Sequence, residues 1–366
     1  MTFLVAFAAG LLRAASPSDT TPPSPPVTRN VVLVVVDGVR WQDVFRGPDS
    51  TLMFGNPDVV GGDTAGIRRK YWRATPTERR SAVMPFLWGT VAKSGEIFGN
   101  RDLGSRADVT NGLKFSYPGY NEMSVGYPDP RVDSNEHGPN ENVTVFEWLN
   151  RRPEYHGRVA AIGTWSAFKD IFNARRSGVH VDAGWDAPYP DAHNAVQRLL
   201  NRLYASTFRQ WDDNAYDSFA HEVTLRYLAD HQPRVLFVGY GETDEWAHDG
   251  RYDRTLNALH AVDGYIAELW STMQADPQYR GRTTLIVTTD HGRGRTTRDW
   301  SDHGRDVEGA EEMWIAVLGP DTPPLGELRN VAPVTQSQIA ASIAAVLGLD
   351  YRRDMPRAAP PLPVVK

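Results

Sequence analysis

The chain has 366 residues with a hydrophobic fraction of 41%, which is typical of a globular protein with a substantial core and excludes a disordered chain. Its 39 basic and 45 acidic residues give a formal net charge of −6 without a long run of either sign, so the sequence offers no electrostatic footprint for a nucleic-acid backbone. The absence of cysteine excludes disulfides, thiolate nucleophiles and thiolate metal sites, and it leaves histidine and carboxylates as the strong metal ligands.

The first 27 residues differ in composition from the rest of the chain. An apolar run at 3–12 is followed by Arg13 and several small residues, and this run is too short to span a bilayer, which takes roughly 20 residues. It resembles the hydrophobic part of an export signal, although no basic region precedes it, and an ordinary disordered tail is the alternative. Residues 16–26 are rich in Pro, Ser and Thr, as in an extended linker. We therefore expect a signal segment and linker at 1–27, a periplasmic or secreted protein, and no membrane span in the mature chain.

The remainder, residues 28–366, is expected to form a single catalytic domain. An unbroken apolar stretch at 31–36 ends at Asp37-Gly38 and predicts a central parallel strand that is buried on both faces. Similar runs follow at 158–162, 234–238, 283–287 and 313–318. Helical periodicity lies between or after them, at 256–269 and 339–347. This alternation predicts an α/β fold with a mostly parallel central sheet between layers of helices.

Two stretches fit this scheme poorly and are expected to be cap-like insertions. Residues 45–73 are rich in Gly, Pro, Asp and Arg, and residues 165–213 carry many aromatic and charged side chains without strand periodicity. Both could wall or cap a site. The aromatic group of the second stretch is interpreted as packing within the cap in preference to a platform for substrate: Trp165, Phe168, Phe172, Trp185 and Tyr189.

Acidic residues follow three of the predicted strands. Asp37 comes directly after the first, Asp244 follows the run at 234–238, and Asp290-His291 closes the run at 283–287. Because the carboxyl ends of parallel strands meet at the ligand-binding edge of a sheet, these carboxylates should converge. Converging carboxylates repel one another and are driven toward protonation unless cations neutralise them. The pattern therefore predicts bound metal.

Histidines complete the candidate ligand set. His248 comes four residues after Asp244, so a helical turn would place both on one face. His303 lies beyond a Gly- and Arg-rich loop that could return it to the site. Three carboxylates and a serine alkoxide carry four negative charges, which two divalent cations would balance. Zinc is the first choice for Asp and His ligands, with manganese or iron as alternatives.

In this order and spacing, the motifs resemble the alkaline phosphatase superfamily, and more closely its type I phosphodiesterase and nucleotide pyrophosphatase branch. The resemblance spans about 31–349, nearly the whole folded body. Its matching pieces are Val-Val-Val-Asp37-Gly38, Phe115-Ser116-Tyr117-Pro118-Gly119-Tyr120 as the nucleophile segment, Asp244-x-x-x-His248, Thr-Thr-Asp290-His291-Gly292, His303-Gly304, and a C-terminal helix within 334–349.

The resemblance implies two metal sites and a nucleophile. One metal would be held, together with Ser116, by Asp37, Asp290 and His291. The other would be held by Asp244, His248 and His303. The implied reaction is hydrolysis of a small-molecule phosphate monoester or diester through in-line attack by Ser116, a phosphoserine intermediate and metal-activated water. Asn135 is expected to match the family's asparagine that hydrogen-bonds a phosphoryl oxygen, although its spacing from Ser116 is slightly off.

The sequence also departs from the family pattern. Ala247 stands where glycine usually precedes the histidine, and Gly119-Tyr120 replaces a common Asn-His, changes that we expect to affect pocket shape more than ligation. A dedicated sulfatase would carry arginine at the position of Tyr120. The remaining alternatives are a metal-dependent phosphomutase resembling cofactor-independent phosphoglycerate mutase, and a non-catalytic module that binds a phosphate ester or a partner. Taken singly, each motif residue has an ordinary interpretation as a turn, helix cap or surface residue, and the prediction depends on their joint occurrence.

Overall fold

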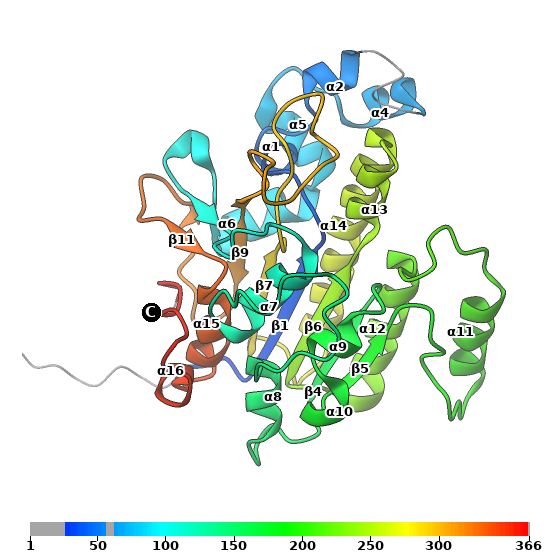
Figure 1. The fold of residues 1–366 in the computed structure, drawn as a ribbon, viewed down its shortest axis with the longest axis vertical. Coiled ribbons are helices and arrows are strands. Elements are labelled where there is room, and N and C mark those ends of the chain that lie inside the picture. The colour runs from blue at the N-terminus through cyan, green and yellow to red at the C-terminus, as the bar shows by residue number, and fades with distance from the viewer. Residues whose placement is uncertain (1–25, 56–61, 365–366) are drawn as a thin grey trace, which may run out of the picture.

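The apolar run that begins at Val31 forms strand β1 (Asn30–Val36), in which every residue is buried. In the computed structural model, which describes residues 26–55 and 62–364, this strand lies near the middle of an eight-stranded sheet (Figure 1). Its neighbours on the two sides, β6 (Val235–Tyr240) and β7 (Thr283–Thr288), run parallel to it. The predicted signal segment and linker at 1–27 lie, except for the last two residues, outside the described residues.

Further strands extend the sheet on both sides, in the order β10-β2-β9-β7-β1-β6-β4-β5. The parallel extension beyond β6 consists of β4 (Val159–Gly163) and β5 (His180–Ala183). The extension beyond β7 begins with an antiparallel strand and consists of β9 (Ile315–Leu318), β2 (Glu96–Phe98) and β10 (Gly326–Glu327). A small second sheet contains β11 (Val334–Thr335), β3 (Ala107–Asp108) and β8 (Glu312–Met313).

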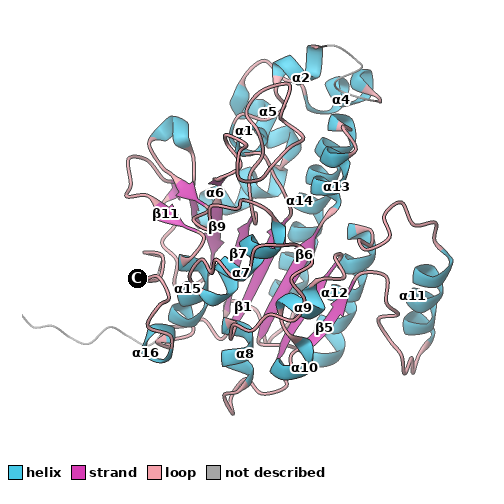
Figure 2. Cartoon of the chain, in the orientation of Figure 1, coloured by secondary structure: helices cyan, strands magenta, loops and turns pink. Residues whose placement is uncertain are grey.

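Helices cover both faces of the large sheet (Figure 2). Alternate residues of β1 point to opposite faces, so Val32 packs in one apolar cluster and Val31 in the other. The cluster of Val32 includes residues of α5 (Pro76–Val83), α12 (Asp217–His231) and α14 (Tyr252–Ala275). The cluster of Val31 includes residues of α7 (Ser116–Val125), α8 (Val145–Asn150) and α15 (Gln338–Val346). The predicted α/β class with a mostly parallel, helix-covered sheet is therefore confirmed.

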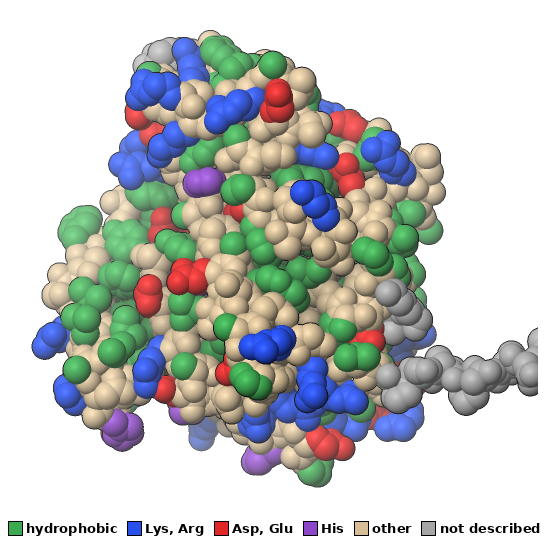
Figure 3. All heavy atoms as spheres, turned by 180° about the vertical axis from the view of Figure 1, so that it is seen from behind, with side chains coloured by type: hydrophobic (Ala, Val, Ile, Leu, Met, Phe, Trp, Pro, Cys, Tyr) green, Lys and Arg blue, Asp and Glu red, His purple; other side chains and the backbone are tan. Residues whose placement is uncertain are grey.

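The remaining helical elements are short, apart from α11. They are α1 (Trp41–Phe45), α2 (Ser50–Phe54), α4 (Thr64–Tyr71), the π-helical turn η1 (Leu87–Val91), α6 (Ala92–Ser94), the 3-10 turn η2 (Arg101–Leu103), α9 (Phe168–Ile171), α10 (Ala174–Ser177), α11 (Ala195–Ser206), α13 (Glu242–His248) and α16 (Tyr351–Asp354). Within the described ranges, none of the helices combines the length and apolarity that crossing a membrane requires. On the rear face, side chains of both charges lie interspersed with apolar surface (Figure 3).

Two details of the strand and insertion predictions differ from the structure. The run at 313–318 is divided at Trp314, which separates β8 in the small sheet from β9 in the large one. The stretch at 165–213 is only partly an excursion, because it contributes the edge strand β5 before α11 projects from the body (Figure 1). The four residues of β5, His-Val-Asp-Ala, contain too few apolar side chains to stand out as a strand in the sequence.

Candidate metal centre and active site

The carboxyl ends of β1, β6 and β7 lie side by side, because Val35 of β1 pairs with residues near the ends of both neighbours. Asp37 follows β1 directly, Asp290 follows β7 after one residue, and Asp244 lies in the first turn of α13, which begins just beyond β6. His291 joins them: its Nε2 lies 3.5 Å from an oxygen of Asp37, 3.5 Å from one of Asp290 and 3.8 Å from one of Asp244. The structure thus brings three carboxylates from distant segments around one imidazole.

The other two predicted histidines lie on the Asp244 side of this group. His248 is one turn after Asp244 on α13, and its Nε2 lies 3.1 Å from Asp244 Oδ2. His303 returns to the site from its loop, with its Nε2 3.0 Å from that of His248 and its ring stacked on His291 at 4.1 Å between centroids. The carbonyl of Lys114 lies 3.3 Å from Nδ1 of His303 and orients the ring.

Two groups of side chains have ligand atoms close enough together to hold a metal ion. The first is Asp37, Asp290 and His291, the same residues that the family resemblance implies for one metal. The second is Asp244, His291 and His303, which has His291 where the sequence predicted His248. His248 nevertheless touches both Asp244 and His303, so it borders the second group.

Ser116 is the first residue of α7, and its Oγ lies 3.4 Å from His291 Nε2. It therefore faces the metal-ligand groups from the N-terminal end of a helix, where backbone amides and the helix dipole favour negative charge. Asn135 lies at the same helix end, where its Oδ1 accepts a hydrogen bond of 2.9 Å from the backbone N–H of Tyr117. Since a phosphoryl oxygen accepts hydrogen bonds, Asn135 would bond to it through its amide nitrogen, while its Oδ1 stays bonded to α7.

The residues that replace the family's Asn-His support the ligands directly. The hydroxyl of Tyr120 donates a hydrogen bond of 2.9 Å to Asp37 Oδ2. Gly119 lets α7 approach the loop after β7, since a Cβ there would lie only 2.6 Å from the carbonyl oxygen of Asp290. Tyr120 thus contacts a predicted ligand directly, and the expectation that these two changes affect pocket shape more than ligation stays a prediction. Ala247, the other departure, is fully buried in the core.

Arg293 is a residue of the site to which the sequence gave no role. Its side chain is 1% exposed, its Nε donates to the carbonyl of Gly38 at 2.7 Å, and its guanidinium forms an ion pair with Asp244 and a hydrogen bond with the carbonyl of Ser301. Gly38 has a φ of +58°, and a side chain at this position would collide with both Asp244 and Arg293. The available signal was the position of Arg293, two residues after His291 in a motif already singled out.

The electrostatics of the site fit a bound cation. Burial, together with Asp290 and Asp244, raises the pKa of Asp37 well above its ordinary value, and burial raises the pKa of Asp290 to about 8. One oxygen of each, Asp37 Oδ1 and Asp290 Oδ2, is buried without a hydrogen-bond partner among the described residues. Burial lowers the pKa of His303 to about 4 and that of His291 well below its ordinary value, so both rings are neutral, as metal ligation requires. A divalent cation would satisfy these orphaned oxygens and stabilise the ionised carboxylates.

Asp244 behaves differently from the other two carboxylates. Burial opposes its ionisation, but Arg293 and His248 outweigh this effect and hold its pKa well below the ordinary value. The contact with Asp244 in turn raises the pKa of His248. In the absence of metal, Arg293 therefore supplies part of the positive charge that this carboxylate needs.

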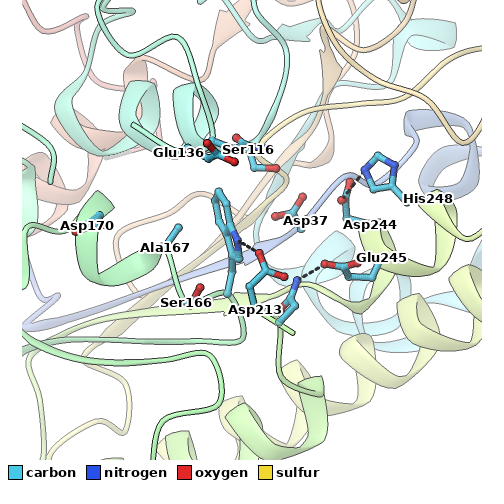
Figure 4. Close-up of a pocket in the computed structure, with 13 residues that line it drawn as sticks. Asp37, Ser116, Glu136, Ser166, Ala167, Asp170, Asp213, Asp244, Glu245 and His248 are labelled. Carbon is cyan, nitrogen blue, oxygen red and sulfur yellow. Dashed lines mark hydrogen bonds and ion pairs between the residues drawn. The ribbon is translucent and has the colours of Figure 1, made fainter. Parts of the chain in front are cut away.

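A pocket of about 480 Å³ opens in front of Ser116, Asp37 and Asp244 (Figure 4). The second predicted insertion, residues 165–213, walls it with five side chains: Trp165, Ser166, Ala167, Asp170 and Asp213. No described residue of the first insertion, 45–73, lines it. The interpretation of the aromatic group as packing applies to Phe168 and Phe172, which are buried in the core, but Trp165 faces the pocket.

Comparisons with known proteins agree with this picture. Residues 207–349 match the model of the Metalloenzyme superfamily. A stretch of 59 residues is 32% identical to a 2,3-bisphosphoglycerate-independent phosphoglycerate mutase from Gracilaria tenuistipitata var. liui. This stretch covers 16% of this chain and only 11% of the mutase. Among solved structures, the alkaline phosphatase PafA matches with a TM-score of 0.59 at 10% identity over 94% of this chain and 100% of that one. A protein of the alkaline phosphatase superfamily from Vibrio parahaemolyticus matches with a TM-score of 0.53 at 12% identity over 90% and 70% of the two chains.

The family model covers only residues 207–349, and the solved structures, at 10% and 12% identity, show that the fold is that of alkaline phosphatase-like proteins. None of these matches singles out the type I phosphodiesterase and nucleotide pyrophosphatase branch.

Proposed function

We propose that this chain, which has the fold of the alkaline phosphatase superfamily, is a phosphoric ester hydrolase that uses Ser116 as its nucleophile. The observation that carries the proposal is the position of Ser116 Oγ, 3.4 Å from an imidazole nitrogen that itself lies within 4 Å of three carboxylates. A serine hydroxyl beside a cluster of metal ligands at a helix N-terminus has what it needs to become an alkoxide.

The proposed metal ligands fall into two sets. The first set acts with Ser116 and comprises Asp37, Asp290 and His291. The second comprises Asp244, His248 and His303. Two bound divalent cations would supply the positive charge that stabilises the ionised serine and the developing charge on the phosphate ester. We propose zinc as the resident metal because imidazoles and carboxylates are among its usual protein ligands.

The chain's own residues carry the covalent step. The Ser116 oxygen attacks phosphorus in line with the ester bond, so that an Oγ–P bond forms while the bond to the leaving alcohol breaks. The alkoxide that leaves takes up a proton and departs as the alcohol. Water then attacks phosphorus, the Oγ–P bond breaks, the serine oxygen regains a proton, and phosphate or a phosphate monoester is released. Tyr120 holds Asp37 in position, and Asn135 holds the first turn of α7, throughout both steps.

Two related activities are weaker candidates. A sulfatase would need arginine at the position of Tyr120, and here that position holds a tyrosine whose hydroxyl is bonded to Asp37. A phosphomutase is favoured by the local match to the phosphoglycerate mutase. It would pass the phosphoryl group from Ser116 to a second hydroxyl of the substrate instead of to water, so measuring released inorganic phosphate against isomerised product separates the two activities.

The proposal is tested by assaying the purified chain with zinc or manganese on matched aryl phosphate monoesters and diesters. In the Ser116→Ala variant we expect kcat to fall by about three orders of magnitude or more, because the nucleophile is lost. Ser124→Ala is the matched control: Ser124 lies on the same helix, and its hydroxyl donates to the carbonyl of Tyr120, so activity should be retained. Undiminished turnover in Ser116→Ala would rule out the proposed nucleophile.

A further inference from the structure

Four carboxylates outside the proposed metal ligands line the pocket in front of Ser116: Glu136, Asp170, Asp213 and Glu245. In Figure 4, Glu136 lies beside Ser116, while Asp213 and Glu245 lie across the pocket from it. None of the residues that line the pocket is a lysine or an arginine. Lys169, which directly precedes Asp170 in the sequence, forms an ion pair with Asp186. Burial raises the pKa of Glu245 to about 7, so the other three carboxylates supply most of the negative charge that the pocket presents to whatever extends from the phosphoryl group.

One side of the pocket, the acidic wall, is formed by Trp165, Asp213, Asn214 and Glu245. Hydrogen bonds hold these side chains in a fixed arrangement. The indole Nε1 of Trp165 donates to Asp213 Oδ2 at 3.0 Å, and the ring packs edge-on against Phe168 with centroids 6.1 Å apart. The amide of Asn214 donates to Glu245 Oε1 at 2.9 Å. Asn214 is 5% exposed, lines the pocket, and its Oδ1 has no hydrogen-bond partner among the described residues. An aromatic ring, two anchored carboxylates and a spare acceptor thus share one wall.

This combination selects among the groups that a phosphate ester can carry. A nucleotide or another polyphosphate would bring further negative charge against four carboxylates, which costs free energy at short range. An uncharged sugar or alkyl group would leave the carboxylates uncompensated. A hydrated metal ion would be satisfied by carboxylates alone and would gain little from an indole. An organic ammonium group gains from both, since aromatic faces attract cations and carboxylates neutralise them.

We propose that the pocket binds an organic ammonium group, so that the substrates are phosphate esters of amino alcohols or of quaternary ammonium alcohols. The inference rests on the proposed hydrolase function and assigns the specificity to Trp165, Asp213 and Glu245. Because the pocket adjoins Ser116, an ester of this kind would place its phosphorus at the nucleophile while its ammonium group lies against the acidic wall.

The test compares esters that differ only in the charge of one atom. Phosphocholine is paired with 3,3-dimethylbutyl phosphate, and p-nitrophenyl phosphocholine with p-nitrophenyl 3,3-dimethylbutyl phosphate, so that both a monoester and a diester are covered. With the metal-loaded enzyme we expect kcat/KM for the ammonium ester of the better-accepted pair to exceed that of its uncharged isostere by about tenfold or more.

Variants locate the source of the preference. Asp213→Asn keeps an acceptor for the indole but removes the charge. It should lower the ratio of kcat/KM for the ammonium ester to kcat/KM for its isostere severalfold. Asp212→Asn is the matched control: this exposed neighbour does not line the pocket, and its substitution should leave the ratio unchanged. Calorimetric titration of Ser116→Ala with phosphocholine gives a readout that does not depend on turnover, and binding should again be weaker when Asp213→Asn is added.

The possible failures are distinguishable. Hydrolysis of the esters without preference for the ammonium member of either pair would overturn this inference and leave the hydrolase function standing. Failure of the metal-loaded chain to hydrolyse any of the four esters or the aryl phosphates would overturn both. A preference that survives Asp213→Asn unchanged would refute the assignment to the acidic wall.

Discussion

Tyr120 lies one turn after Ser116 on α7, and its hydroxyl holds one oxygen of Asp37 while the other oxygen remains without a hydrogen-bond partner. The tyrosine thereby determines which oxygen of Asp37 faces His291 and the proposed metal. Side chains that orient a ligand in this way typically contribute 10–100-fold to metal affinity.

We therefore expect Tyr120→Phe to weaken zinc binding by about 10–100-fold, measured by competition with a chromogenic chelator. Tyr117→Phe is the control, because Tyr117 lies on the same helix as Tyr120 but its hydroxyl points away from the ligands and donates to the carbonyl of Gly138. Equal zinc affinities in wild type and Tyr120→Phe would show that Asp37 is oriented by other contacts.

Arg293 connects three segments through Gly38, Asp244 and Ser301. Removing one partner of a buried ion pair typically costs about 3–5 kcal/mol, because the remaining charge is left uncompensated. We expect Arg293→Ala to lower the free energy of unfolding by roughly 3 kcal/mol without metal, and by less with zinc, because a bound cation would restore positive charge beside Asp244. Urea unfolding with zinc or with chelator measures both values.

Arg295→Ala serves as the control for this loop, since Arg295 is 40% exposed, its partner Glu308 is 77% exposed, and its buried partner Glu312 keeps a second ion pair with Arg101. Its loss should change the stability by about 1 kcal/mol or less under either condition. If Arg293→Ala lowers the free energy of unfolding equally with and without zinc, the arginine contributes through packing and not through its charge.

At the scale of elements, the approach of α7 to the loop after β7 places Ser116 within reach of His291. This approach depends on Gly119, where any Cβ would press on the carbonyl of Asp290. Overpacking of this kind typically costs about 1–3 kcal/mol, so Gly119→Ala should lower the midpoint of urea unfolding and reduce turnover by displacing α7. Gly264→Ala, within α14 and with open space around it, should instead be neutral or stabilising. The reverse order of stabilities would contradict this account of the helix position.

The elements that the sequence predicted well are those with a strong local signal. The buried strand before Asp37 is an unbroken apolar run, and the spacing of Asp244 and His248 matches one turn of α13. Topology then placed their carboxylates at one sheet edge without any knowledge of side-chain contacts. The acidic wall had no such signal, because Trp165, Asp213 and Glu245 become neighbours only when the insertion folds back over the sheet. The edge strand β5 was missed because its four residues contain too few apolar side chains, and the role of Arg293 was missed although it lies two residues after His291 in a motif already singled out.

At the scale of the whole molecule, the candidate metal centre joins segments near residues 37, 116, 244 and 290, so its charge state is coupled to global stability. Asp290 is the clearest case, since burial raises its pKa from 3.8 to about 8 in the metal-free fold. The folded chain then binds this proton more tightly than the unfolded chain does. Stability contributed by Asp290 is accordingly present below pH 4 and is lost as the pH rises toward 8.

This coupling predicts opposite pH responses with and without metal. In chelator, wild-type stability should fall between pH 5 and pH 8 relative to Asp290→Asn, which keeps the oxygen that accepts from the backbone of Gly38 but carries no charge. With zinc the wild type should be more stable than Asp290→Asn, because ligation requires the ionised carboxylate. A ligand at about 1,000 times its Kd adds about 4 kcal/mol to the free energy of unfolding of the wild type. Thermal unfolding of both chains at several pH values, in chelator and in zinc, measures the four trends. If wild type and Asp290→Asn follow the same curve in chelator, Asp290 is already neutralised within the protein, and the case for a cation at this carboxylate fails.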